Sequence, residues 1–364
     1  MGCPNSLNLT PYYQHKLTII SLVLVVMMLY VHGIYNEVEL FRTSYVVKSV
    51  IARLSYRVIN PTYFTISGLL FFKGVCAAAD CLPKIKKRIR TVLVPFILWS
   101  AITILEQLVF AQIPAIRPYV NPNVLDHFLS WSEGLTFFFL RPAFFHLWFL
   151  RDLMVFVFLS PLLYWLIKKV RWYLAPVVLI ATPPLIQWFG LEHLEIGFFI
   201  LGGTIALFSD LESVRSWLSK PIVIIAAILY FGLSFTWDFL LPKQFAGEEY
   251  LSIFFSICGM ITLWRGYDWL AQRPSSPVYN PILLAVTNFT FFIYLFHEPI
   301  LFVIMQMNKA WLGVNAWSMT FLYLVNPLLL IVIAISVAVV LKKAMPKAYS
   351  ILVGGRTVRH QARQ

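Results

Sequence analysis

The chain has 364 residues, of which 60% are hydrophobic, 16% aromatic and only 12% charged, and its formal net charge is +13 at pH 7. Soluble domains carry about 25% charged residues, so this composition excludes a soluble globular protein and predicts a polytopic membrane protein. The positive charge does not indicate nucleic-acid binding, because Lys and Arg separate the apolar runs as they do in loops that face anionic lipid headgroups.

Apolar segments that are each close to the length needed to cross a bilayer, about 20 residues, follow one another along the chain. They cover residues 17–35, 61–78, 91–111, 145–167, 172–190, 196–209, 221–241, 250–264, 282–304 and 317–341. The sixth and eighth are short and are expected to be tilted, broken or re-entrant. The predicted fold class is all-α, with about ten transmembrane helices.

The distribution of basic residues predicts the orientation. If the N-terminus is inside, the connections on that side and the C-terminal tail hold most of the 29 Lys and Arg residues. Cytoplasmic loops carry such an excess, so both termini are predicted to be cytoplasmic. We expect one multispanning domain over residues 1–345, followed by a basic cytoplasmic tail over 346–364.

Two outer connections are long. Residues 36–60 place scattered Lys and Arg between apolar positions, which predicts an amphipathic helix on the membrane surface. Residues 112–144 contain Pro114, Pro118 and Pro122 and are predicted to form an irregular loop that faces the substrate.

Three histidines are predicted to lie at a similar depth. His32 is about 15 residues into the first span, or about 22 Å above the inner surface at 1.5 Å per residue. His146 begins the fourth span at its outer end, and His297 is about 15 residues into the ninth, which again starts inside. A neutral imidazole with a pKa near about 6.5 can take a proton from a hydroxyl and return it. We expect a polar pocket in the outer half of the membrane.

Each of these residues also has a structural interpretation. A single imidazole such as His297 is often only a hydrogen-bonded packing element, and Asp152 can simply neutralise Arg151. His32 has no adjacent charge, and a functional role is favoured for it. Charged groups inside lipid cost several kcal/mol, roughly 2.5–3.5 on insertion scales, and usually face a partner or a cavity. Around these histidines lie Trp148, Arg151, Asp152 and Glu298.

A basic run, residues 84–90, enters the third span from the inner side. Such a run is commonly only a topology signal, but at the mouth of a cavity Lys87, Arg88 and Arg90 could bind the phosphates of a cytosolic ligand. The sequence contains no phosphate-binding glycine loop, no Gly-x-Ser-x-Gly elbow and no His-Glu-x-x-His pair. We expect neither a resident cofactor nor a bound metal.

Five segments, in order, resemble the membrane-bound acyltransferase family 3, the bacterial surface-glycan O-acyltransferases. They are LVLVVMMLYVH (22–32), YFTISGLLFF (63–72), KKRIRTVLVPFILWS (86–100), HLWFLRDLMVFVFLSPLL (146–163) and FIYLFHEPIL (292–301). The resemblance implies that His32 is the catalytic histidine. Arg88 would correspond to the first Arg of an Arg-x-x-Arg motif on the acyl-donor side. The second falls on Thr91, so Arg90 would substitute for it.

As the resemblance implies, the protein would transfer an acetyl or succinyl group from cytosolic acyl-CoA to a hydroxyl of an envelope or exported glycan, in the bacterial inner membrane. His32 and His297 are the candidate catalytic residues. Candidate substrate-binding residues are Lys87, Arg88, Arg90, His146, Trp148, Arg151, Asp152 and Glu298. The expected partners are acyl-CoA, a glycan or lipid-linked glycan acceptor and membrane lipids, with a homo-oligomer left open.

Two other classes remain open. A transporter could use the same cavity to move a saccharide or a lipid-linked glycan without chemistry, although the sequence shows none of the internal repeats that are usual in transporters. A pure assembly factor is the third class. Replacement of His32 by Ala discriminates among them, because only an enzyme loses acyl transfer while glycan export continues.

Overall fold

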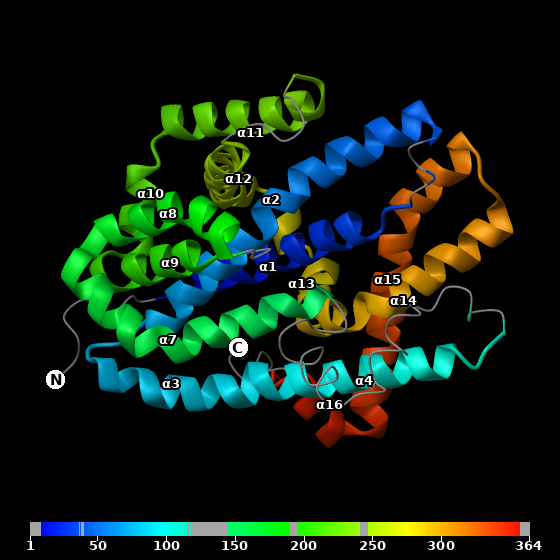
Figure 1. The fold of residues 1–364 in the computed structure, drawn as a ribbon, viewed down its shortest axis with the longest axis horizontal. Coiled ribbons are helices and arrows are strands. Elements are labelled where there is room, and N and C mark those ends of the chain that lie inside the picture. The colour runs from blue at the N-terminus through cyan, green and yellow to red at the C-terminus, as the bar shows by residue number, and fades with distance from the viewer. Residues whose placement is uncertain are drawn as a thin grey trace. The chain divides into compact units, whose positions relative to one another are not determined.

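Helices account for all of the regular structure that can be described. The computed structural model describes residues 9–35, 37, 40–114, 117, 145–189, 195–240 and 247–356 (Figure 1). Across these ranges no strand is present, and the predicted all-α fold class is confirmed. Most of the predicted loop 112–144, and residues 357–364 of the predicted tail, lie outside the described residues.

The elements follow the apolar segments of the sequence. The α-helices are α1 (Pro11–His32), α2 (Arg42–Phe72), α3 (Cys81–Arg88), α4 (Val94–Phe110), α7 (Trp148–Val170), α8 (Leu174–Phe189), α9 (Ile196–Phe208), α10 (Leu211–Trp217), α11 (Lys220–Leu240), α12 (Glu248–Ala271), α13 (Pro281–Thr287), α14 (Thr290–Leu312), α15 (Ala316–Ala344) and α16 (Pro346–Leu352). Short 3₁₀ turns are η2 (Ala78–Asp80), η6 (Phe145–Leu147), η7 (Arg171–Tyr173) and η8 (Pro277–Tyr279), and η3 (Ile89–Leu93) is a π-helix.

Within the described ranges, five helical stretches are long and apolar enough to cross a membrane, and a sixth is added if a bent pair is one span. The five are Pro11–His32, Ala78–Phe110, Trp148–Ile186, Thr290–Leu312 and Ala316–Ala344. The bent pair is α9 with α10, which meet at 109°. The protein is therefore a multi-pass membrane protein, while the number of ten spans and the cytoplasmic termini stay predictions.

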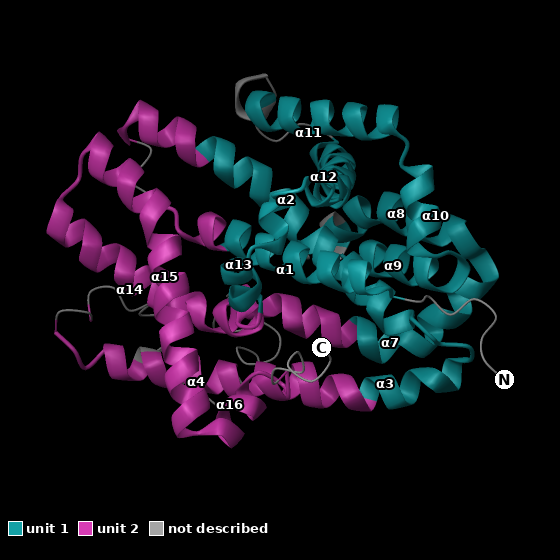
Figure 2. Ribbon diagram, turned by 180° about the vertical axis from the view of Figure 1, so that it is seen from behind, with its two compact units in different colours: residues 1–28, 49–85, 156–287 teal, residues 29–48, 86–155, 288–364 magenta. Residues whose placement is uncertain are grey.

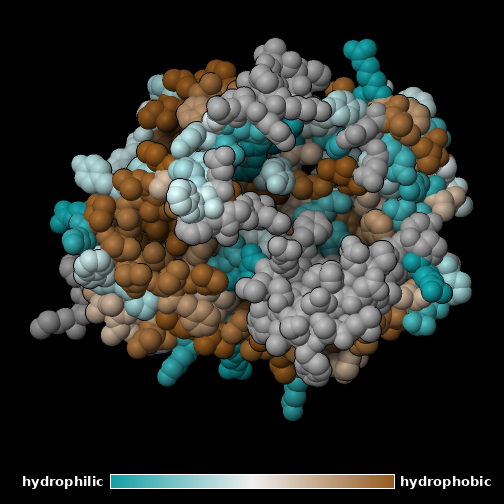
Figure 3. Space-filling view, viewed as in Figure 1, coloured by the Kyte–Doolittle hydropathy of each residue, from teal (hydrophilic) through white to brown (hydrophobic). Residues whose placement is uncertain are grey.

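Hydrophobic residues also cover broad areas of the surface (Figure 3). On α11, Ile222, Ile224, Ile225 and Ile228 are all exposed. Exposed apolar side chains around one helix are typical of contact with lipid chains.

Helix α2 differs from the expectation. Residues 36–60 and 61–78 were expected to form a surface helix and a separate span, but Arg42–Phe72 is one continuous helix that passes through Pro61. Proline has no N–H to donate to the carbonyl four residues earlier, which is that of Arg57. The hydroxyl of Ser256 on α12 donates to this carbonyl instead, at 2.5 Å. A tertiary hydrogen bond thus replaces the missing helical one.

The chain forms two compact units, coloured separately in Figure 2. Unit 1 comprises residues 1–28, 49–85 and 156–287, and unit 2 comprises residues 29–48, 86–155 and 288–364. All of the candidate site residues belong to unit 2.

In unit 1, α2 and α9 pack backbone against backbone. A Cβ atom on Gly202 would lie 1.9 Å from the carbonyl oxygen of Thr65, and one on Gly68 would lie 2.0 Å from that of Phe199. Only glycine fits at these two positions. Small residues allow such close packing of helices in membranes. The hydrophobic effect does little to hold helices together in lipid, so this packing contributes much of their association.

Unit 1 also contains a cluster of buried charges that the sequence did not reveal. Lys16 on α1 lies 2.7 Å from Asp268 on α12, and their side chains are 0% and 2% exposed. The Lys16 ammonium lies 3.7 Å from the centre of the Trp264 ring. Arg265 donates to Oδ2 of Asp268 at 2.8 Å. The Tyr12 hydroxyl donates at 2.6 Å to Oδ1, the same oxygen that Lys16 contacts. Every charge in this cluster has a partner.

In unit 2, α14 packs along α15 and is tied to the chain that follows α1 by a buried polar network. Tyr35 donates to the carbonyl of Met305 at 2.9 Å and accepts from Asn326 at 2.5 Å. Asn308 in turn donates to Asn326 at 2.7 Å. This network holds the segment just after His32 against α14 and α15.

Candidate active site

The site is built around a break in α14. Glu298 has φ −108° and ψ 136°, which is extended backbone inside a helix, and Pro299 follows it. A residue before proline is pushed out of the α region by a clash with the proline ring, and proline offers no N–H to the helix. The Glu298–Pro299 dipeptide therefore interrupts α14 directly after His297.

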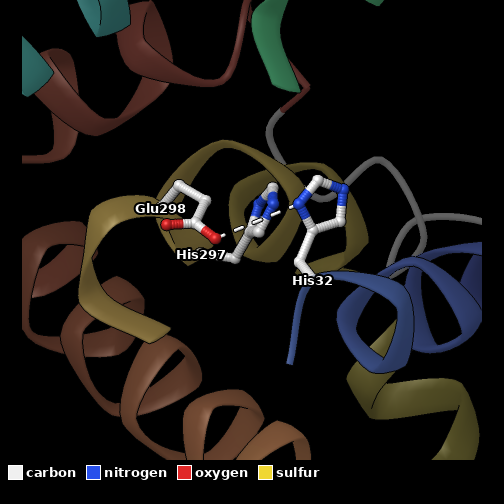
Figure 4. A group of neighbouring side chains, drawn as sticks. All are labelled: His32, His297 and Glu298. Carbon is white, nitrogen blue, oxygen red and sulfur yellow. Dashed lines mark ion pairs between the residues drawn. The ribbon is translucent and has the colours of Figure 1, made fainter. Parts of the chain in front are cut away.

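His32 is the last residue of α1, and it lies beside this break (Figure 4). Its Nδ1 is 3.9 Å from Oε1 of Glu298, and both side chains are only slightly exposed. The ring centres of His32 and His297 are 5.0 Å apart, with the ring planes at 80°. Residues 265 positions apart in the chain thus meet in one cluster of unit 2.

His297 is fully buried and is oriented by its own helix. Its Nδ1 lies 2.6 Å from the carbonyl oxygen of Tyr294. A carbonyl only accepts hydrogen bonds, so Nδ1 carries the hydrogen and Nε2 of the neutral ring is left with a lone pair. Within the part of the chain that the structure describes, Nε2 of His297 has no hydrogen-bond partner.

His146 completes the row of rings. Its ring centre is 4.6 Å from that of His297. The hydroxyl of Tyr294 donates to the carbonyl of His146 at 2.7 Å. Tyr294 therefore positions two histidines, one through its carbonyl and one through its hydroxyl. The expectation from depth that the three histidines meet is confirmed, with His297 in the middle.

Arg151 and Asp152 form a close ion pair at the start of α7. The Nε atom of Arg151 lies 2.8 Å from Oδ1 of Asp152. This contact matches the interpretation in which Asp152 neutralises Arg151, and a role of either residue toward substrate stays a prediction. Trp148, at the first position of α7, is partly buried.

The basic residues lie where α3 passes into the π-helix η3. Lys87 and Arg90 are exposed and Arg88 is partly buried. Among the described residues, no carboxylate forms an ion pair with any of the three, and no hydrogen bond joins them to the histidines. Their role in binding substrate stays a prediction.

The cluster of His32, His297 and Glu298 could support proton transfer or hold a metal. His32, His297 and Glu298 each offer one ligand atom, and these three atoms lie within 4.8 Å of one another. Two imidazoles and a carboxylate also form a set that takes up a proton and stabilises the resulting imidazolium. The expectation of no bound metal stays a prediction.

Tyr294 is the site residue that sequence reasoning missed. It lies three residues before His297 on α14, the spacing at which helical side chains are neighbours. That spacing was the available signal. Its hydrogen bond to the carbonyl of His146 joins residues 148 apart in the chain, and the helical spacing does not predict this bond.

Comparison with known proteins decides the chemistry. Residues 17–342 match the profile of a family described as Acyltransferase domain, Acyl_transf_3. The chain belongs to this acyltransferase family. The match includes His32 and the break at Glu298, and the protein is an enzyme that transfers acyl groups.

A relative of this acyltransferase is the succinoglycan biosynthesis protein ExoH of Rhizobium meliloti (strain 1021). The two are 25% identical over 313 residues, which are 83% of this chain and 80% of the relative. No solved structure matches the chain.

Proposed function

We propose that this acyltransferase is an O-acyltransferase of the bacterial inner membrane that moves an acetyl or succinyl group from cytosolic acyl-CoA to a hydroxyl of an envelope or exported glycan. The relative's role in succinoglycan biosynthesis supports a glycan acceptor. The proposal includes about ten spans with both termini in the cytoplasm. One observation carries the chemistry: His32, His297 and Glu298 gather at the break in α14.

His32 acts as the general base. Glu298 faces Nδ1 of His32, so Nε2 takes the proton of the acceptor hydroxyl. The hydroxyl oxygen attacks the thioester carbonyl, the C–S bond breaks, and the imidazolium returns the proton to the departing thiolate. The distance of 3.9 Å is longer than a hydrogen bond, and such contacts commonly tighten when substrate binds.

The other residues position this pair. His297 packs its ring against His32, and Tyr294 holds both His297 and His146 in place. Trp148, Arg151 and Asp152 shape the acceptor side. Lys87, Arg88 and Arg90 take the donor phosphates, for which the fixed fork of donors on arginine is suited.

Replacement of His32 tests the proposal. In cells that produce His32→Ala, the exported glycan should lose the mass of its acyl group in mass spectrometry, while the amount of glycan stays unchanged. A positioned general base contributes about 10²–10⁴-fold to a rate, so purified enzyme should lose acyl transfer by that factor.

The matched control is His15→Gln on the same helix. His15 lies in unit 1, where its Nδ1 is 2.6 Å from the Tyr267 hydroxyl. This variant should retain acyl transfer. Loss of glycan export in His32→Ala, with no acylated product from the wild type, would instead indicate a transporter.

A further inference from the structure

The chain after α16 folds back onto the π-helix η3. Gly354 and Gly355 both have positive φ, +64° and +71°, which side chains other than that of glycine rarely adopt. A Cβ atom on Gly354 would lie 2.4 Å from the carbonyl oxygen of Thr91. The Nε1 atom of Trp99 on α4 also donates to the carbonyl of Leu352 at 3.2 Å. This segment of unit 2 is therefore seated on the α4 side by close backbone contact.

The fold-back brings Arg356 to the junction of α3 and η3, where Arg88 lies. The Arg356 guanidinium carbon lies 3.6 Å from the centre of the Phe291 ring, and Nη1 donates to the carbonyl of Val353 at 3.4 Å. Gly354 touches Thr91, so Arg356, two residues after Gly354, comes to the part of unit 2 that carries Arg88, three residues before Thr91.

Within the described residues, these two charges have no acidic partner. Neither Arg88 nor Arg356 forms an ion pair with any carboxylate in the described parts of the chain. Arg356 is exposed and Arg88 is partly buried. Like charges that lie near each other repel, and charge-assisted bonds to an oxyanion are the strongest compensation for guanidinium groups. The pair is arranged to receive an anion.

We propose that Arg356, together with Arg88, binds the phosphate groups of the acyl donor. This inference rests on the proposed use of acyl-CoA and deepens it, because it replaces Arg90 with Arg356 as the partner of Arg88. Two guanidinium forks grip two phosphate oxygens each, while Phe291 holds the Arg356 plane in place by stacking. An anionic lipid headgroup offers the same phosphate chemistry, and the test separates the two sources.

The test measures binding of coenzyme A and of inorganic pyrophosphate to the full-length protein by calorimetry, in nanodiscs of neutral lipid. Arg356→Gln should weaken binding of both probes about tenfold or more. Arg356→Lys keeps the charge without the fork and should recover part of the loss. Lys347→Gln removes an exposed charge from α16 and should bind both probes as the wild type does.

Equal affinities of the wild type, Arg356→Gln and Lys347→Gln for both probes would overturn the inference. Arg356-dependent binding of pyrophosphate without any binding of coenzyme A would support the anion site and reject acyl-CoA as the donor. Native mass spectrometry covers the other source of phosphate. If anionic lipid added to the nanodiscs displaces both probes and stays bound to the wild type but not to Arg356→Gln, the site belongs to lipid and the donor role is rejected. If Arg356→Gln does not fold, Arg356→Lys carries the comparison.

Discussion

Each unit contains a cluster of ionisable side chains, and the two clusters differ in how many hydrogen-bond partners their charged groups have. In unit 1, Asp268 accepts from Lys16, Arg265 and Tyr12, and the Lys16 ammonium lies against an aromatic ring. In unit 2, the only polar contact shown for the Glu298 carboxylate within the described residues is His32 at 3.9 Å. The first cluster is fully paired and the second retains binding capacity.

This difference separates structure from chemistry. A buried charge whose hydrogen bonds are all made cannot act on a substrate without first losing a partner. A carboxylate and an imidazole nitrogen with unused capacity, such as Nε2 of His297 among the described residues, cost stability, and they are retained where a reaction needs them. We therefore expect substitutions in the first cluster to lower stability and those in the second to lower the rate.

The largest effect is expected for Lys16→Met. Loss of one partner from a buried pair costs about 3–5 kcal/mol, because the remaining charge is left uncompensated. The free energy of unfolding, measured by denaturant titration in detergent, should fall by that amount. Lys220→Met, at the exposed start of α11, is the matched control. A fall no larger than that of the control would contradict the structural role of Lys16.

Glu298→Gln should lower turnover rather than stability. The amide keeps the shape of the side chain but cannot stabilise a charged His32, so acyl transfer should fall about 10–100-fold while the free energy of unfolding does not fall. Glu249→Gln, an exposed change of the same kind on α12, should leave turnover unchanged. An unfolded Glu298→Gln protein would place Glu298 with the structural cluster.

Tyr294→Phe tests the link between two histidines. It removes the hydroxyl that donates to the His146 carbonyl and leaves the bond from His297 to the Tyr294 carbonyl intact. One buried hydrogen bond contributes about 1 kcal/mol, so stability should drop by that amount and turnover should fall several-fold. Tyr250→Phe, at an exposed position, should change neither. Unchanged turnover in Tyr294→Phe would remove His146 from the working site.

A surface pair gives a smaller and pH-dependent effect. The hydrogen bond from Lys309, at 2.8 Å, lowers the pKa of Glu37 from its ordinary value near 4.5. The stabilisation is therefore present above about pH 4.5 and is lost as the pH falls through the lower pKa of the folded state. Exposed pairs contribute about 0–1 kcal/mol. Glu37→Gln should lower the melting temperature slightly at pH 7 and by less at pH 3, and an equal loss at both would contradict the pairing.

Metal removal should have no effect. The three ligand atoms of the pocket are close enough to hold an ion, but the proposed mechanism needs the lone pair of His32 for the acceptor proton. Dialysis of the purified enzyme against a chelator should leave acyl transfer unchanged. Loss of activity that zinc restores would replace the general-base mechanism with a metal-dependent one.

Much of this protein is predictable from its sequence because lipid imposes simple rules. Apolar runs of sufficient length must form helices in a bilayer, where every backbone polar group needs an internal partner. Residues 196–209 and 317–341 accordingly correspond to α9 and α15 within a few residues. The depth of a residue also follows from counting along a span, which is why the meeting of His32, His146 and His297 could be anticipated.

Pairings between distant segments depend on how helices pack, and no local pattern encodes them. The partner of Lys16 is 252 residues away, and that of Asn326 is 291 residues away. The sequence alone therefore determined a helical membrane protein and predicted that three of its histidines meet. Only the tertiary structure decided which charges are compensated and which remain available, because compensation is a property of neighbours in space.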